Sequence, residues 1–343
     1  HIAYLGIALL ALILRFADLG QAPLNPPEAE QALAIWDLWL PGGEQVVPFS
    51  PAYFFITALL TQVVGFSDSV MRVIPAIFGF LLALTPWLLR HRSGRLGALV
   101  TALLLAISPL QTVASRTVGG QAIALFAGML LFVTWLRYQE SGDRRWLFAL
   151  AAALALGLTS SPVFYATLFA LAVAWLAQRA IGPALIRDGE GRRAPLVRPA
   201  AQDIRLALVI GIASFMVIST AIFLAMRGLG SSADLLSGWL GQFKLVAGAS
   251  TRIGPFAVLS RYEAGLILLG LPAAVWAAVK EKPYPVFLVY WTLAALLLIL
   301  IQPGSMPNVL LLTLPGYLLV GRFSNDILSR PSSNWWWAFA AAI

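Results

Sequence analysis

Long apolar runs separated by short polar stretches make up most of the chain, and no stretch alternates apolar and polar residues as a strand does. Ten runs have the length of helices: 2–16, 69–89, 96–109, 118–136, 146–158, 161–178, 206–226, 262–280, 284–301 and 308–321. A bilayer core of about 30 Å is crossed by roughly 20 helical residues, and shorter or interrupted helices are tolerated where other helices cover them. The pattern therefore predicts an all-α, polytopic transmembrane helical bundle. With a further run that begins near residue 334, we expect about ten or eleven spans. Since the chain stops inside that run, we also expect more membrane helices beyond it.

The composition supports a membrane protein and excludes several soluble classes. Sixty per cent of the 343 residues are hydrophobic and 11% are charged, whereas about a quarter of the residues of a soluble domain are charged. This excludes an ordinary soluble enzyme, a disordered protein and a nucleic-acid-binding module. The absence of cysteine excludes disulfides and thiolate metal sites. Residues 1–343 are predicted to form a single transmembrane domain.

The distribution of basic residues predicts the orientation, because cytoplasmic loops are enriched in Lys and Arg. One more apolar run, 51–66, is ambiguous. If it does not cross the membrane and the N-terminus is cytoplasmic, 16 of the 23 Lys and Arg residues lie in cytoplasmic loops, at 90–95, 137–145, 179–205, 280–283 and 322–333. We therefore predict a multi-pass protein of the cell membrane, with loop 17–68 outside and 51–66 as an outer juxtamembrane helix. In the alternative, 51–66 crosses, the N-terminus is inverted and loop 17–50 is cytoplasmic.

The first outer loop contains the clearest local signal. Asn25, Pro26 and Glu28 have the spacing of a helix N-cap, a first-turn proline and a capping-box carboxylate. The helix runs to about Leu40, and its apolar stripe, which includes Trp36, is typical of a helix that lies on a membrane surface. Two interpretations of Glu28 stay open, a capping carboxylate or a carboxylate that accepts a proton from an acceptor hydroxyl.

Two arginines at predicted outer helix ends are candidate phosphate ligands, because a guanidinium binds phosphate oxygens bidentately. Arg72 lies about one turn into an apolar run, and the alternative role is a snorkelling side chain paired with Asp68 at helical spacing. Arg116 is the only charged residue in a short polar bend, where it either binds phosphate or solvates a helix end.

The order of these segments resembles the membrane glycosyltransferases of the GT-C superfamily. The resemblance rests on the acidic helix start at Glu28, on "SPAYF" at 50–54, on "GFSDSVMRVIPAIFG" at 65–79, and on "RHRSGRLGA" and "ISPLQTVASR" at 90–98 and 107–116. It is nearest to the family-39-like branch of protein mannosyltransferases and lipid A aminoarabinose transferases. It covers roughly residues 5–180. Residues 181–343 add further transmembrane helices and agree only in hydropathy pattern.

The resemblance implies transfer of a sugar from a polyprenyl-phosphate donor to a protein, lipid or glycan acceptor at the outer membrane face. Glu28 occupies the glutamate position of the family's Asp-Glu pair, whereas Pro27 occupies the aspartate position and Gln121 lies near a second acidic position. The candidate site residues are Glu28 and Glu30 for catalysis, Arg72, Arg116 and Arg261 for the donor phosphate, and Tyr53 and Trp36 for acceptor or lipid contacts.

The predicted outer acids contain no Asp-x-Asp pair of the kind that holds a metal in oligosaccharyltransferases, so we expect no metal ion and no other cofactor. The expected partners are the polyprenyl-phosphate-linked sugar, membrane lipids and other membrane subunits, and we expect no nucleic acid. The departures at Pro27 and Gln121 motivate an alternative function, a catalytically silent GT-C-fold subunit that acts as a scaffold in a larger membrane complex.

Overall fold

The computed structural model describes residues 2–40, 50–183, 197–221, 227–243, 249–302 and 305–329. Every regular element in these ranges is a helix, which confirms the all-α class. The elements are α1 Ile2–Phe16, α2 Pro26–Leu38, α3 Pro51–Val64, α4 Asp68–Leu84, η1 Thr85–Leu89, α5 Arg90–Ser93, α6 Arg95–Ile107, α7 Pro109–Arg116, α8 Gln121–Ser141, α9 Arg144–Leu158, α10 Pro162–Ala180, α11 Ala201–Thr220, α12 Gly228–Leu240, α13 Ala249–Tyr262, α14 Ala264–Lys280, α15 Pro283–Ile301 and α16 Pro307–Leu328.

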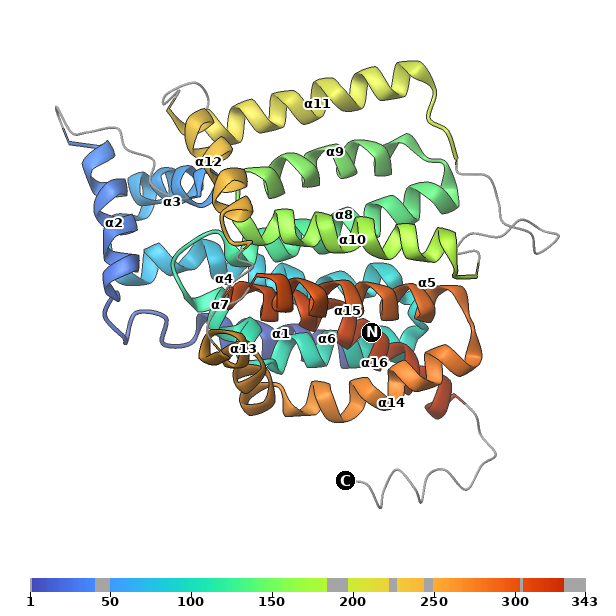
Figure 1. Cartoon of the computed structure of the whole chain (residues 1–343). Coiled ribbons are helices and arrows are strands. Elements are labelled where there is room, and N and C mark those ends of the chain that lie inside the picture. The colour runs from blue at the N-terminus through green and yellow to red at the C-terminus, as the bar shows by residue number, and fades with distance from the viewer. Residues whose placement is uncertain are drawn as a thin grey trace.

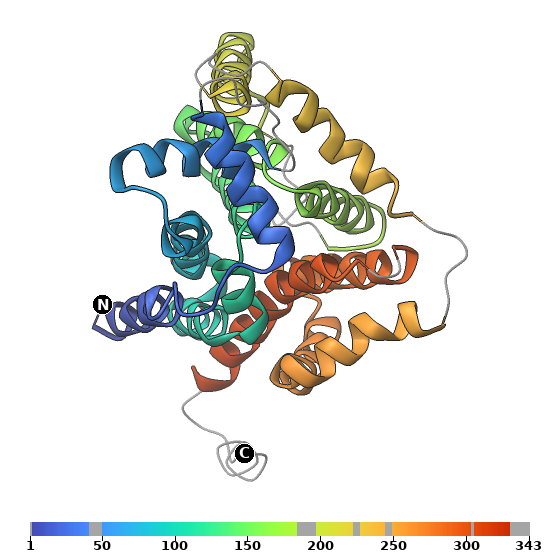
Figure 2. The same cartoon turned by 90° about the vertical axis from the view of Figure 1, so that its left-hand side faces the viewer.

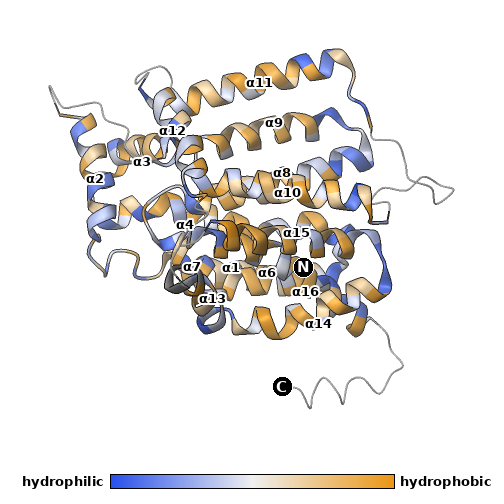
Figure 3. Cartoon of the chain, in the orientation of Figure 1, coloured by the Kyte–Doolittle hydropathy of each residue, from blue (hydrophilic) through white to orange (hydrophobic). Residues whose placement is uncertain are grey.

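The long helices run side by side as a bundle (Figure 1), which Figure 2 shows from one end. Among neighbouring pairs, α6 packs against α16, α10 against α15, and α9 against both α8 and α11. Hydrophobic residues dominate the middle of the long helices, and hydrophilic residues gather toward their ends (Figure 3). We call the end that holds α2, α3, α7, α12 and α13 the α2 end. The opposite end, with the α8–α9 and α14–α15 turns, is the basic end.

Each of the ten predicted runs overlaps a helix, and the additional run near residue 334 lies outside the described residues. Among the described residues, five helices are long and apolar enough to cross a membrane, or up to seven if each of two bent helix pairs counts as one span. This is fewer than the expected ten or eleven, because helices such as α1 and α9 have only 15 residues. Short helices of this kind are tolerated where neighbouring helices cover their polar backbone groups.

Two apolar clusters hold the bundle together. The larger one fills the middle, where Phe132 stacks on Phe287 with ring centroids 5.4 Å apart and Trp291 packs beside them. The smaller one lies at the α2 end and joins Ala32 and Ile35 of α2 to Phe54 and Phe55 of α3 and to other apolar residues of α4 and α8. This second cluster fixes α2 across the end of the bundle.

The helices at the α2 end begin where local sequence dictates. The Asn25 side chain accepts a hydrogen bond from the Glu28 amide, and the Glu28 carboxylate accepts one from the Asn25 amide, so the predicted capping box is present. Ser50 and Ser67 cap α3 and α4 by a single bond each, because their side chains accept from the backbone amides of Tyr53 and Val70. The chain directions at this end are therefore set by short polar signals.

Candidate functional site

Glu28 and Arg72 form a buried ion pair at the α2 end. Nη2 of Arg72 lies 2.7 Å from Oε2 of Glu28, and the two side chains are only 7% and 5% exposed. Arg72 Nε donates a second, longer bond of 3.4 Å to Oε1. The pair joins the first turn of α2 to the second turn of α4, so the charged residue inside the apolar run is paired, as its position requires.

Arg72 also binds the main chain of the loop that precedes α2. Its two terminal nitrogens donate to the carbonyls of Leu19, Ala22 and Pro23, over distances of 2.7 to 3.2 Å. A guanidinium has five N–H donors, and the five hydrogen bonds to these carbonyls and to Glu28 match that number. The side chain therefore orders loop 17–25 around itself, and the site as it stands leaves it no spare donor.

The Glu28 carboxylate likewise has several hydrogen-bond partners. Besides Arg72, its carboxylate accepts a 2.8 Å bond from the amide of Val118 and a 3.1 Å bond from the amide of Asn25. Burial by itself raises the pKa of this carboxyl, but the hydrogen bonds from Arg72, Val118 and Asn25 outweigh it and lower the pKa below its usual range. A carboxylate with a lowered pKa is a weak base, so this geometry suits a capping and anchoring role.

Arg116 caps the end of another helix. Its Nη1 donates to the carbonyls of Leu14 and Ala17, over 3.0 and 2.7 Å, and its Nη2 donates to the carbonyl of Asp18 over 3.1 Å. These carbonyls belong to the last turn of α1 and the residues that follow, where acceptors are left without intrahelical partners. Arg116 lies two residues before Val118, so a short chain of contacts links it to Glu28 and Arg72.

The bend between α7 and α8 is built for close approach of main chains. Gly119 has φ +134°, a conformation that L side chains rarely adopt. A Cβ atom at Gly120 would lie 2.0 Å from the Ser160 carbonyl oxygen and 2.3 Å from Ser50 Oγ. The bend thus packs directly on the α3 cap and on the α9–α10 turn. Gln121, near the second expected acidic position, is the first residue of α8.

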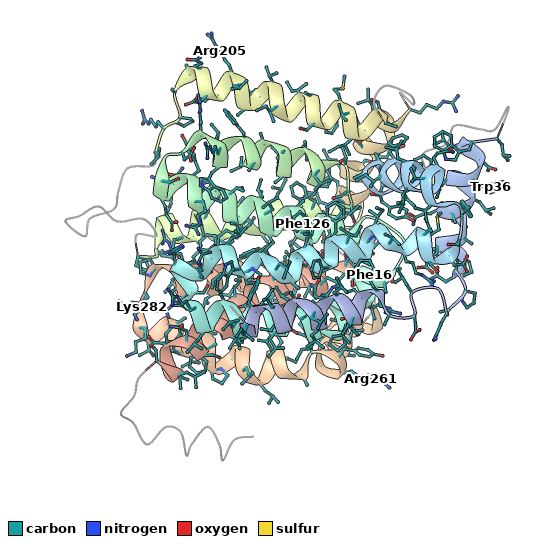
Figure 4. All side chains as sticks on the ribbon, turned by 180° about the vertical axis from the view of Figure 1, so that it is seen from behind. Phe16, Trp36, Phe126, Arg205, Arg261 and Lys282 are labelled. Atoms are coloured by element: carbon teal, nitrogen blue, oxygen red, sulfur yellow. The ribbon has the colours of Figure 1, made fainter. Side chains whose placement is uncertain are left out.

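The other predicted site residues lie in different surroundings. Glu30 is exposed on α2, and Trp36 is about half exposed and packs edge-on against Phe66 at 5.1 Å. Tyr53 is buried, and its hydroxyl donates to the Met71 carbonyl at 2.8 Å. Arg261 is exposed at the end of α13, with its guanidinium over the Tyr262 ring. Figure 4 shows Arg261 well apart from Trp36 at this end of the bundle.

Two buried charges were missed as site residues. Arg15 is fully buried in the last turn of α1, and Glu263 is 3% exposed at the junction of α13 and α14. The sequence signal that could have identified them is a charged residue at the edge of an apolar run. Such a charge is costly unless it is paired or hydrogen-bonded. Among the described residues, no group of three or more His, Asp or Glu side chains could hold a metal ion.

Comparison with known proteins finds similarity in part of the sequence and in the fold. Residues 47–187 match the family model described as dolichyl-phosphate-mannose-protein mannosyltransferase. No curated protein sequence matches the chain. The match to the family model includes α3, α4 and the α6–α7 bend, which also carry much of the resemblance in sequence.

Solved structures extend the likeness to nearly the whole chain. The crystal structure of ArnT from Cupriavidus metallidurans bound to undecaprenyl phosphate superposes with a TM-score of 0.66 and 16% identity, over 96% of this chain and 60% of that one. The apo oligosaccharyltransferase of Archaeoglobus fulgidus gives a TM-score of 0.58 and 15% identity, over 99% of this chain and 53% of that one. The chain thus spans between half and two thirds of the length of these proteins.

The fold comparison and the match over 47–187 agree with the resemblance found in the motifs. The helices that are long and apolar enough to cross a membrane agree with it too. The chain is a multi-pass membrane protein with the fold of ArnT and of the archaeal oligosaccharyltransferase, and its residues 47–187 are similar to the mannosyltransferase family.

Proposed function

We propose that the chain is an integral membrane glycosyltransferase that takes a sugar from a polyprenyl-phosphate carrier and transfers it to a protein, lipid or glycan hydroxyl. The observation that carries the proposal is the fold match over 96% of the chain to ArnT, a protein whose structure holds undecaprenyl phosphate. The family match at 47–187, to a model described by a dolichyl-phosphate-mannose donor, supports the same donor class.

The proposed reaction takes place at the α2 end, facing away from the cytoplasm. The basic end carries Arg92, Arg137, Lys280, Lys282 and the start of α11 with Arg205, and Figure 4 shows Arg205 and Lys282 both at that end, on separate helices. Since Lys and Arg are enriched on the cytoplasmic side, this arrangement supports a cytoplasmic basic end. We therefore apply the orientation predicted from the loop charges to the bundle as a whole, with the basic end in the cytoplasm and the α2 end outside.

Within this site the charged residues divide into two groups. Glu28, Arg72 and Arg116 are bound to main-chain groups and to each other's segments, so we assign them to holding the α2 end in shape. Arg261 and Glu30 are exposed, so they are the candidates that can reach substrate. We assign Arg261 to the donor phosphate and Glu30 to the acceptor hydroxyl, with Trp36 in contact with lipid.

Donor binding tests the assignment of Arg261. The full chain is purified in nanodiscs, and its Kd for undecaprenyl phosphate is measured for wild type, Arg261→Gln and Arg227→Gln. A hydrogen bond to a charged group contributes about 1.5–3 kcal/mol, so Arg261→Gln should weaken binding by roughly 10- to 100-fold. Arg227, an exposed arginine at the same end, is the matched control. Equal affinities for all three proteins would refute the role of Arg261.

Transfer tests the assignment of the base. With a mannosyl polyprenyl phosphate as donor, Glu30→Gln should lower the rate by about 10²- to 10⁴-fold, the usual contribution of a general base. Asp37→Asn on the same helix is the control. If Glu28→Gln and Glu30→Gln are combined and the full rate survives, neither carboxylate is the base.

A second candidate function is favoured by the hydrogen bonds that join Glu28, Arg72 and Arg116 to main-chain groups. A GT-C-fold subunit without activity needs these contacts for shape and needs no free base or phosphate ligand. This candidate predicts no transfer and no saturable binding of undecaprenyl phosphate, together with stable co-purification of other membrane proteins. Saturable binding that depends on Arg261 would exclude it.

A further inference from the structure

The transition from α6 to α7 is a helix broken at one point. The two helices meet at Ser108-Pro109 and are bent by 58°. Proline has no N–H to offer the Leu105 carbonyl, and it pushes the residue before it away from the helical region. Ser108 accordingly has ψ 120°. The break leaves carbonyls of α6 and amides of α7 without the partners that a continuous helix would supply.

Arg15 of α1 supplies donors to the open carbonyls. Its Nη2 donates to the Leu105 carbonyl at 2.9 Å and its Nη1 to the Ala106 carbonyl at 3.2 Å. In a continuous helix these two oxygens would accept from residues 109 and 110. The side chain is fully buried, and Gly79 of α4 leaves room for it, since a Cβ at that position would lie 3.1 Å from Arg15 Nε.

Glu263 supplies acceptors to the open amides of the same break. Its Oε1 accepts from the Leu110 amide at 3.2 Å and from the Ser108 hydroxyl at 2.5 Å, while its Oε2 accepts from the hydroxyl of Tyr317 on α16. Ser108 Oγ in turn accepts from the Gln111 amide at 3.2 Å. Glu263 therefore satisfies the first turn of α7 directly and through Ser108.

The two charges match the two ends that they contact. The carboxyl end of a helix carries partial negative charge and the amino end partial positive charge. The cation of Arg15 contacts the end of α6, and the anion of Glu263 contacts the start of α7. The charges come from α1 and from the α13–α14 junction, so two distant segments of the chain meet at one break.

We propose that Arg15 and Glu263 are a pair of positioning residues that hold the α6–α7 break and thereby fix the direction of α7. The consequence for the α2 end is direct, because α7 ends in Arg116, which caps α1, and is followed by Val118, whose amide binds Glu28. This inference concerns the shape of the site and stands whether or not the protein transfers a sugar.

The test measures the position of α7 and requires no activity. The sequence has no cysteine, so cysteines introduced at Val113 of α7 and Leu33 of α2, which are 63% and 60% exposed, take spin labels selectively. The distance between the labels is measured in the full chain by pulsed electron paramagnetic resonance. A pair at Leu176 and Leu208, on α10 and α11, is the control for the rest of the bundle.

Arg15→Met and Glu263→Leu should each cause loss of the narrow 33–113 distance peak and leave the 176–208 peak unchanged. Pro109→Ala restores an N–H at the break and allows Ser108 to become helical. Adding it to Arg15→Met should therefore restore a narrow 33–113 peak, at a position shifted toward a straighter helix. A general loss of packing at Arg15 would not be repaired in this way. Arg227→Met should change neither peak.

Several outcomes would overturn the proposal. One is a 33–113 peak that stays narrow in both Arg15→Met and Glu263→Leu. Another is a 33–113 distance distribution that is as broad in the double variant, Arg15→Met with Pro109→Ala, as in Arg15→Met alone. If Arg15→Met fails to fold, folding of the double variant supports the proposal. If neither variant folds, the open carbonyls of α6 are not the reason why the fold requires Arg15.

Discussion

The two ends of the bundle use the same residue types in different surroundings. At the α2 end, Glu28 and Arg72 are 5% and 7% exposed and are surrounded by main-chain hydrogen-bond partners. At the basic end, Arg92 and Glu140 lie 2.5 Å apart and are 22% and 28% exposed, while Lys282 and Asp326 lie 3.4 Å apart and are 45% and 13% exposed. Ion-pair distance alone does not separate the two ends, whereas burial and the surrounding partners do.

The difference indicates where the bundle is held rigidly. A buried charge that loses its partner leaves an uncompensated ion in a low dielectric, whereas an exposed charge is solvated by water. We therefore expect the α2 end to depend on each of its charged contacts. We expect the basic end to tolerate the loss of any one of its ion pairs. Variants at the two ends should therefore differ in the size of their effect on stability.

Arg72→Gln should strongly destabilise the protein, by about 3–5 kcal/mol, because it leaves the Glu28 carboxylate buried without its cation. The measurement is thermal unfolding in detergent, compared with Arg92→Gln at the basic end. The double variant Glu28→Gln with Arg72→Gln should lose less than the sum of the two single variants, since the remaining groups are neutral. If Arg72→Gln costs no more than Arg92→Gln, the contrast between the two ends is wrong.

Gly120→Ala tests the close packing of main chains at the α2 end. The new Cβ would lie 2.0 Å from the backbone oxygen of Ser160, which cannot move away as a flexible side chain can. We expect a cost of about 1–3 kcal/mol or more, as for other overpacked sites. Gly265→Ala on α14 is the control, because a Cβ there meets nothing within 4 Å, and it should be neutral or slightly stabilising. Equal unfolding temperatures for both variants would contradict the packing argument.

The lowered pKa of Glu28 predicts a pH dependence of stability. A carboxyl whose pKa is lower in the folded protein than its ordinary value of 4.5 stabilises the fold above that value, and this stabilisation is lost as the pH falls through the folded pKa. The stability gap between wild type and Glu28→Gln should therefore be largest near neutral pH and should narrow below a pH of about 4.5. Glu30→Gln, at an exposed position, should follow the wild-type profile. A gap that is constant with pH would show that the Glu28 charge is not what the α2 end uses.

Much of this contrast could be predicted from the sequence where the signal is local. The apolar runs placed the helices, and the spacing of Asn25 and Glu28 gave the capping box. The partner of Arg72 could not be found this way. Its proposed helical partner was Asp68, four residues away, whereas in the structure it pairs with Glu28, 44 residues away. The choice depends on how α2 lies against the other helices of this end, which the smaller apolar cluster decides.

The roles of Arg15 and Glu263 were also beyond local signals. Pro109 marks a helix break in the sequence, but the groups that satisfy it come from Arg15, 90 positions from Leu105, and from Glu263, 153 positions from Leu110. Which charge meets which helix end is fixed only when α1, α6 and the α13–α14 junction pack together. The proposed roles of Arg261 and Glu30 also stay predictions, because they depend on contacts with substrate.

Lys282→Gln should produce the smallest effect. Its ammonium lies 3.4 Å from Asp326 and is 45% exposed, and surface ion pairs of this kind contribute about 0–1 kcal/mol. Because salt screens exposed charges, the small loss should shrink further when thermal unfolding is repeated in high salt, whereas the loss in Arg72→Gln should persist. If high salt reduced both losses to the same extent, the Glu28–Arg72 pair would be as accessible to solvent as the basic end. The large contribution of Arg72 would then have to come from its hydrogen bonds to the carbonyls of loop 17–25 rather than from its ion pair with Glu28.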